Sequence, residues 1–253
     1  MIVLIGDQSD EGLLLDTVEC ALTSSSDEKI VRLRNVEAKD VYTASYVLER
    51  VAVNTPTNTI FLAAVDGFND SARVPIALMS KDGRIFVGFD NGIFTAVAER
   101  FGIRQIRRIE KGELSLSFID STMNILVPAV IDLVNGVDFS SVGELYMTYY
   151  SLKYHKIDIT AHSIEGEVAF LDNGNVETNI PFSLLEKIGV ENGDELTIQG
   201  KIITVTEDER EKENKELILR KGIGGYAEII SKGNASKILK VEIGEKIILE
   251  VLS

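Results

Sequence analysis

The chain has 253 residues, of which 45% are hydrophobic and 26% are charged, and its formal net charge is -14. This composition is typical of a soluble globular protein with one large domain or two ordinary ones. The acidic charge disfavours nucleic acids and anionic membrane surfaces as partners, because both attract basic proteins.

Cysteine usage and apolar segments indicate the compartment in which the protein works. The single cysteine, Cys20, cannot form an internal disulfide or a cysteine-rich zinc site, so we expect a reducing, cytoplasmic location. Residues 1–6 are apolar but too few for a signal peptide, and no apolar run is long enough to cross a bilayer. The absence of Trp and the many Ile, Val, Glu and Lys residues are typical of a thermophilic source.

The first part of the chain predicts a three-layer α/β domain. Residues 59–65 are continuously apolar, which is typical of a strand buried on both faces of a parallel sheet, and Asp40 is placed to cap a helix. In chain order we expect a strand at 2–5, a helix at 13–22, a strand at 30–33, a helix at 42–53, a strand at 59–65, a hairpin at 76–87 and helices at 93–101 and 126–134.

The chain changes character after about residue 146. Residues 149–156 are polar and aromatic without a helical period, which predicts a connector. From residue 163 onward, short apolar runs alternate with Gly, Asn and Asp turns, as in a small β-barrel. The charged run 207–213 predicts a solvated turn or loop. The expected strands lie at 166–171, 195–198, 201–205 and 246–251.

The connector sets the expected domain boundary. It falls between residues 150 and 162, and we place it after residue 155. The prediction is therefore an N-terminal α/β domain at 1–155 and a C-terminal β-barrel domain at 156–253.

Polar residues directly follow three of the expected strands. Asp7 follows the first strand, Asp66 follows the most apolar one, and Asp90 with Asn91 follows 85–87. In open α/β sheets, ligands bind beyond the carboxyl ends of the strands. Each position alone is also typical of a turn. Three such positions in one half of a sheet favour a ligand site.

Asp66 and Arg73 stand at the two ends of one short segment. A guanidinium close to the carboxylate would keep it ionised and oriented, and the pair could then polarise a bound water. The alternative is a salt bridge that stabilises a loop.

Residues 172–180 are dense in amide and carboxylate side chains, among them Asp172, Asn175 and Asn179. Amides suit the edge of a purine, and carboxylates suit an ammonium group or ribose hydroxyls. The run Asp-Asn-Gly-Asn is also typical of a hairpin turn. The same alternative applies to the glycine-containing segment that leads to Asn234 and Ala235.

Other common site types are not expected. His155 and His162 lie seven residues apart without a recognisable third ligand, so we predict no metal site. The glycine spacings match no phosphate-binding fingerprint, and the GxSxG hydrolase motif is absent.

Taken in order, these segments resemble the superfamily of S-adenosylmethionine (SAM) hydroxide adenosyltransferases and adenosyl chlorinases and fluorinases. Residues 63–73 resemble its Val-Val-Asp-Pro-Gly-Val-Gly-Thr-x-Arg motif, with the Asp-to-Arg spacing kept. Residues 172–180 resemble its Asp-x-Phe-Gly-Asn-x-x-Thr-Asn-Ile motif. Further likeness lies in residues 4–7, 87–93, 225–229 and 232–235, so the resemblance spans nearly the whole chain.

The resemblance implies an N-terminal α/β domain, a C-terminal β-barrel and a homotrimer that binds SAM, without a separate cofactor. It implies that Asp66 and Arg73 position and activate a water, which displaces methionine from the ribose 5′ carbon. Asp66 sides with the water-using branch, because the halogenases typically carry Tyr at that position. The ligand contacts that the resemblance implies are those of Asp7, Asp90, Asn91, Asp172, Asn175, Asn179, Asn234 and Ala235.

Several positions depart from the family pattern. The catalytic His of the water-using branch is absent, and Ser121 stands at its place. Gly12 occupies the position of an Asp that holds the ribose hydroxyls, for which Asp10 or Glu11 is the alternative. Residues 32–35 replace an Asp-x-Thr-His strand. The segment that begins at Asp172 is one residue short and lacks its Phe.

These departures leave three hypotheses. In the first, Ser121 or Thr122 hydrogen-bonds the nucleophile, Asp66 remains the base, and SAM is hydrolysed to adenosine and methionine. In the second, the chain binds an adenosyl ligand without catalysis and acts as a binding or regulatory protein. In the third, it is a structural or assembly protein that binds no nucleoside.

Overall fold

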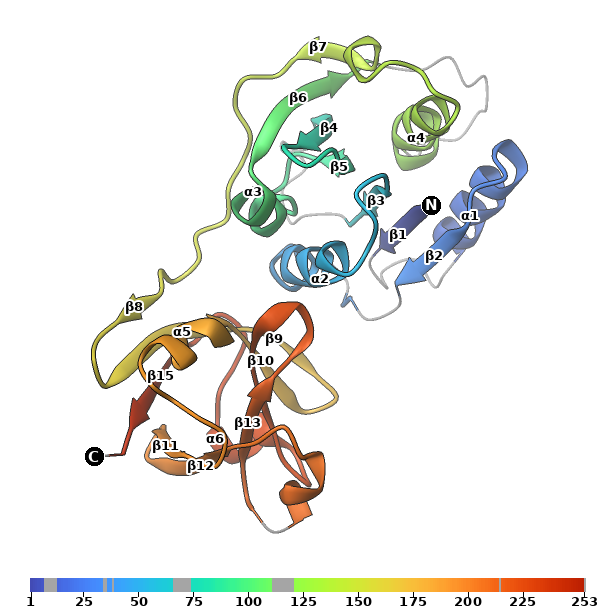
Figure 1. Ribbon diagram of the computed structural model, residues 1–253. Helices are drawn as coiled ribbons and strands as arrows, with labels where there is room; N and C mark the ends of the chain where they lie inside the picture. Colours follow the sequence, from blue (N-terminus) through green and yellow to red (C-terminus); the bar gives the residue numbers. More distant parts are fainter. Residues whose placement is uncertain are drawn as a thin grey trace. The chain divides into compact units, whose positions relative to one another are not determined.

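The computed structural model describes residues 1–6, 13–33, 36–37, 39–65, 74–110, 121–213 and 215–252. The chain divides into two compact units, residues 1–152 and 153–253, which are treated separately below (Figure 1). The first is an α/β unit and the second is a β-barrel, so the fold class expected from the sequence is confirmed.

Strands and helices alternate through most of the first unit. Its described strands form a seven-stranded sheet in the order β2-β1-β3-β5-β4-β6-β7, in which β2, β1, β3 and β5 are parallel neighbours. The strands are β1 (Ile2–Gly6), β2 (Ile30–Leu33), β3 (Ile60–Ala64), β4 (Pro75–Ser80), β5 (Ile85–Phe89), β6 (Ile103–Ile109) and β7 (Gly143–Leu145). The helices are α1 (Leu13–Ser25), α2 (Val41–Val53), α3 (Thr95–Phe101), the π-helix η3 (Thr122–Leu126), α4 (Val127–Val134) and the 3-10 helix η4 (Phe139–Ser141).

Alternate residues of the central strands face opposite sides of the sheet, because the side-chain period of a strand is two. In β3, Ile60 and Leu62 pack with residues of α1 and α4, whereas Phe61 and Ala63 pack with residues of α2 and α3. Figure 1 shows α1 and α4 on one side of the sheet and α2 and α3 on the other. The continuous apolar run is therefore buried on both faces, and the unit has three layers.

The second unit closes into a barrel. Its described strands follow the order β10-β14-β13-β12-β11-β15-β9-β8, and a further pairing of β9 with β10 completes the ring, with β8 outside it. The strands are β8 (Asp158–Ile159), β9 (Ser163–Asp172), β10 (Asn175–Pro181), β11 (Glu195–Ile198), β12 (Lys201–Val205), β13 (Ile218–Lys221), β14 (Tyr226–Ile230) and β15 (Lys246–Val251). The helices are α5 (Phe182–Lys187), α6 (Ala235–Leu239) and the 3-10 helices η5 (Glu209–Glu213) and η6 (Ile223–Gly225).

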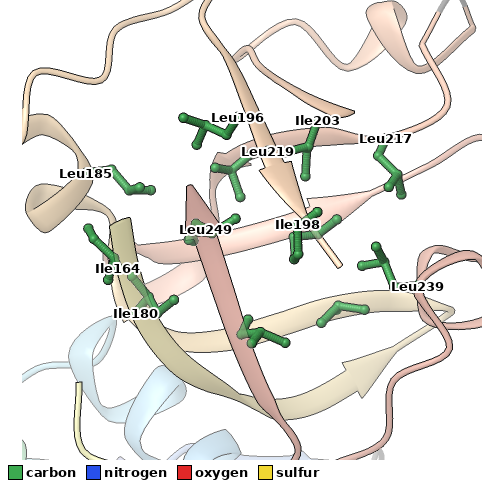
Figure 2. Packing of buried hydrophobic residues seen from close by; sticks show 14 of the residues in the cluster. Ile164, Ile180, Leu185, Leu196, Ile198, Ile203, Leu217, Leu219, Leu239 and Leu249 are labelled. Atoms are coloured by element: carbon green, nitrogen blue, oxygen red, sulfur yellow. The ribbon is translucent and has the colours of Figure 1, made fainter. Parts of the chain in front are cut away.

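Aliphatic side chains fill the barrel. Figure 2 shows some of them, including Leu196, Leu219 and Leu249, directed into the interior from three different strands. These three side chains are at most 1% exposed. The barrel interior is a packed core, so polar side chains in the same strands lie on its outer face.

Within the described ranges, no helix is both long and apolar enough to span a membrane.

Candidate functional site

Three parallel neighbours bring their carboxyl ends to one edge of the sheet. Gly6 at the end of β1 lies opposite Ala64 at the end of β3, and Ala63 lies opposite Gly88 near the end of β5. The segments that follow these strands therefore start from the same edge, which is where ligands bind in open α/β sheets. Of the candidates expected there, Asp7, Asp66 and Arg73 lie outside the described residues.

Asp90 follows β5 and is buried, with 9% of its surface exposed. Its carboxylate accepts two hydrogen bonds, one from the Tyr150 backbone N–H at 2.7 Å and one from the Tyr146 hydroxyl at 3.1 Å. Burial raises the pKa of the Asp90 carboxyl, and these two hydrogen bonds lower it in part. The carboxylate thus holds the chain that leads out of the first unit.

Asn91 uses both ends of its side-chain amide on the protein itself. Its Nδ2 donates to the Val65 carbonyl at 2.8 Å, and its Oδ1 accepts from the Ile93 N–H at 3.2 Å. The structure therefore places Asn91 against the residue that precedes Asp66.

Ser121 begins the helical stretch that continues through η3 into α4. Its side chain is half-buried and makes no capping hydrogen bond. The next residues, Thr122 and Met123, are buried, and Met123 packs in the same cluster as Phe89 at the end of β5. Ser121 therefore leads directly into a segment that packs near the carboxyl edge of the sheet.

On the barrel, Asp172 and Asn175 face each other across a two-residue hairpin turn between β9 and β10. The turn residues Asn173 and Gly174 have φ angles of 50° and 87°, which is the pattern of a type I′ turn. Asn173 Nδ2 donates to Asp172 Oδ1 at 3.0 Å. The hairpin expected from the sequence is present, and it is compatible with a ligand site.

The structure brings this turn to the start of α6. Asn234 caps the helix, because its Oδ1 accepts from the Lys237 N–H at 2.8 Å. The Ser236 N–H donates to the Gly174 carbonyl at 3.2 Å. Ala235 is fully buried in the barrel core, so its side chain is not exposed to a ligand. The turn between Asp172 and Asn175 therefore lies beside the start of α6.

Asn179 lies at the other end of β10, about 13 Å along the strand from Asn175. Its Oδ1 accepts from the Glu167 N–H at 2.8 Å, and its Nδ2 donates to the His155 carbonyl at 3.0 Å. Glu167 Oε2 in turn accepts from the His155 N–H at 2.6 Å. In the barrel, Asn179 therefore holds the incoming connector.

A buried polar cluster on the barrel was not predicted. Glu177 and Glu228 are paired across β10 and β14, and each is 4% exposed. Glu228 accepts from Asn175 Nδ2 at 3.0 Å and from Arg220 Nε at 2.7 Å. Gly222 lies against both carboxylates, where an added Cβ would come within 3.3 Å of an oxygen of each. The available signal was Glu228 inside the otherwise apolar strand β14, whereas Glu177 lies in a strand with several other polar residues.

The described parts of the chain contain no group of three or more His, Cys, Asp or Glu side chains able to hold an ion. His155 and His162 are exposed. The candidate groups are carboxylates, amides and one serine hydroxyl. They can bind hydroxyl, ammonium and purine groups and can accept a proton.

Two family profiles match the chain. The SAM hydroxide adenosyltransferase N-terminal domain matches residues 2–143, and the SAM hydroxide adenosyltransferase C-terminal domain matches residues 166–248. The (R)-S-adenosyl-L-methionine hydrolase of Methanocaldococcus jannaschii is 30% identical over 237 residues, which cover 88% of this chain and 83% of that protein.

Two solved structures have the same fold. An uncharacterized conserved protein from Thermotoga maritima has a TM-score of 0.88 and 30% identity, and the match covers 98% of this chain and 99% of that one. A conserved hypothetical protein from Thermus thermophilus has a TM-score of 0.77 and 22% identity, with 99% of each chain covered. At the second identity, the likeness concerns the fold alone.

Proposed function

Because the chain belongs to the SAM hydroxide adenosyltransferase family, we propose that it binds SAM and hydrolyses it to adenosine and methionine. The observation that carries the proposal is the common edge of β1, β3 and β5, from which the segments bearing Asp7 and Asp66 depart. A relative that covers most of the chain is named as a hydrolase of (R)-S-adenosyl-L-methionine.

The proposed reaction is a displacement at the ribose 5′ carbon. A water oxygen forms a bond to this carbon while the carbon–sulfur bond breaks, and the bonding pair stays on sulfur. The sulfonium departs as a neutral thioether, so the leaving group needs no acid. The proton of the attacking water passes to the Asp66 carboxylate and then to solvent, and Arg73 keeps that carboxylate ionised before the step.

Ser121 has a supporting role in this proposal. Its hydroxyl both donates and accepts, so it can orient a water without taking its proton. In this arrangement, placement and partial desolvation of the water account for most of the rate enhancement.

Product formation tests the proposal directly. Purified protein is incubated with each sulfonium epimer of SAM, and adenosine and methionine are separated by chromatography. We expect adenosine and methionine in equal amounts, preferentially from the (R) epimer, and loss of both in Asp66→Asn. Clear binding by calorimetry without adenosine above background would exclude hydrolysis.

The second candidate is an adenosyl-binding protein without catalysis. Two departures from the family pattern favour it. Ser121 stands where the family has its catalytic His, and Gly12 stands where the family has a ribose-binding Asp. It predicts calorimetric binding of SAM with no turnover, and an Asp66→Ala variant whose affinity is largely unchanged. Hydrolysis predicts turnover that this variant abolishes.

The homotrimer implied by the resemblance belongs to the same proposal. Light scattering coupled to gel filtration tests it, because the mass of one chain is 27.8 kDa. A mass of one or two chains at micromolar concentration counts against the trimer.

A further inference from the structure

The turn after β5 holds both residues that flank the segment 66–73. Asn91 Nδ2 donates to the carbonyl of Val65, which directly precedes that segment, at 2.8 Å. The Asp90 backbone N–H donates to the carbonyl of Val74, which directly follows it, at 2.8 Å. Two consecutive residues therefore fix the two points between which Asp66 and Arg73 lie in the sequence.

The turn itself is firmly held. Asn91 is 9% exposed, and its Oδ1 accepts from the Ile93 N–H within the same turn. Gly92 has a φ of 100°, and an added Cβ there would lie 2.8 Å from the Leu152 side chain. The amide of Asn91 cannot turn toward a ligand without giving up the bond to Val65.

The strand ladder alone does not supply this restraint. The β3–β5 pairing ends at Ala63 and Gly88, so the Val65 carbonyl lies beyond the last residue pair of the ladder. The Asn91 amide replaces the missing backbone donor at this point.

We propose that Asn91 is a positioning residue, which acts on catalysis by fixing the point where the segment carrying Asp66 and Arg73 leaves β3. Its kinetic consequence rests on the proposed hydrolysis, whereas its structural consequence does not. A catalytic pair must be held within a fraction of an ångström, and a shift of about 1 Å can cost a hundredfold in rate. Asn91 therefore affects kcat through Asp66 without touching SAM.

Two variants test the role of Asn91. Asn91→Asp keeps the acceptor for the Ile93 N–H and replaces the donor to Val65 with a carboxylate oxygen, whereas Asn91→Ala removes both the donor and the acceptor. The matched control is Asn54→Ala, which also deletes an asparagine amide that donates to a backbone carbonyl, that of Arg50, at 2.9 Å. Asn54 lies at the end of α2, outside the candidate site.

We expect kcat for adenosine formation to fall about tenfold to a hundredfold in both Asn91 variants, with KM nearly unchanged. The acidic limb of the pH–kcat profile moves to higher pH, because a less well placed Arg73 stabilises the Asp66 carboxylate less. A loss of stability alone would lower the amplitude of the profile without moving this limb. Asn54→Ala leaves kcat and the position of the acidic limb unchanged.

Hydrogen–deuterium exchange tests the hold of Asn91 on Val65 without relying on activity. Exchange at the end of β3 becomes faster in the Asn91 variants than in the wild type and in Asn54→Ala. Unchanged exchange, or an unchanged acidic limb in an active enzyme, overturns the inference. A wild-type protein that makes no adenosine overturns the hydrolysis and the kinetic role together. In that case exchange at the end of β3 alone decides whether Asn91 holds it.

Discussion

The side chains expected to touch the ligand also hold the fold, and Asp90 shows the chemical cost of doing so. Its carboxylate is buried and accepts from Tyr146 and Tyr150, while burial raises its pKa. Two hydrogen bonds do not fully replace the hydration of an ionised carboxylate. A neutral amide of the same shape avoids this cost.

Asp90→Asn should therefore be at least as stable as the wild type at neutral pH. Because the folded pKa is raised above its ordinary value of 3.8, the contribution of Asp90 to stability is fully present below that pH. It is lost as pH rises through the folded pKa. Urea unfolding at pH 4 and pH 7 should show that the advantage of the variant grows with pH. An advantage that shrinks with pH would contradict this account.

Gly174 combines two constraints that can be separated by a matched pair of variants. It has a φ of 87°, and an added Cβ would lie 2.7 Å from Asn234 Nδ2. Gly189, in the same unit, has a φ of 86° and no atom within 4 Å of an added Cβ. Both alanine variants adopt an unfavourable backbone conformation, but only Gly174→Ala also displaces the cap of α6.

Gly189→Ala should therefore cost about 1–2 kcal/mol, the penalty for a left-handed alanine. Gly174→Ala should cost about 1 kcal/mol more, because moving Asn234 weakens the cap. Urea unfolding of the barrel measures both. Equal losses would mean that Asn234 moves away freely, and the turn and the cap would not be coupled.

At the scale of elements, Pro128 explains the π-helix that follows Ser121. A proline cannot donate to the carbonyl four residues back, that of Asn124, and its ring crowds that carbonyl. The helix widens instead, and the Val127 N–H donates to the Thr122 carbonyl five residues back. Short π-helical segments within α-helices are frequent at functional sites.

Pro128→Ala should let this stretch return to the α-helical repeat. A return from π-helical to α-helical hydrogen bonding removes about one residue from the turn, which rotates Ser121 by about 100° relative to α4. We expect thermal stability that is equal or higher, since the new N–H can pair, together with lower adenosine formation, as in Ser121→Ala. Unchanged activity in Pro128→Ala, beside a loss in Ser121→Ala, would show that the π-helix does not orient the serine.

The pattern of apolar residues predicted the elements whose signal is local. The runs at β1 and β3 and the hairpin of β4 and β5 fall where expected, and Asp40 caps α2 by accepting from the Thr43 N–H. Several segments were not predicted, and two of them show the reason. β6 carries three arginines among seven residues, and α6 is only five residues long. In each case, pairing or packing with distant segments decides the structure, and periodicity does not report it.

The candidate site was predictable in position but not in the use of each residue. Strand exits at one sheet edge and a hairpin turn rich in amides were readable from residue types. The sequence did not predict the hydrogen bond from Asn91 to the Val65 carbonyl or the one from Asn179 to the His155 carbonyl. Each of these bonds joins residues from different elements of the fold.

At the scale of the whole molecule, the connector is fastened at both ends. In the first unit, the Leu152 N–H donates to Thr95 Oγ1 at 2.9 Å. In the barrel, Glu167 and Asn179 hold the His155 backbone. Only two residues, numbers 153 and 154, lie between these fastened points. Residues 152–155 thus form a short strap. Its local opening requires breaking hydrogen bonds of one unit or the other.

Asn179→Ala should make the strap easier to cleave. Lys153 and Lys156 are exposed and are trypsin sites beside the held residue His155. The variant loses two hydrogen bonds, and only the one to the His155 carbonyl holds the strap. Losing that bond, worth about 1 kcal/mol, raises the population of the open strap, and hence the cleavage rate, about fivefold.

The control for this experiment comes from the same strand. Asn175→Ala deletes a hydrogen bond of equal length, 3.0 Å, to Glu228 and leaves the connector untouched. Limited trypsin digestion of the ligand-free protein, followed by mass spectrometry, gives the rates after Lys153 and Lys156. If both variants are cleaved equally fast, loss of barrel stability is the cause. If only Asn179→Ala is cleaved faster, and urea unfolds its barrel no more easily than that of Asn175→Ala, this amide, which was predicted to bind a ligand, fastens the connector to the barrel.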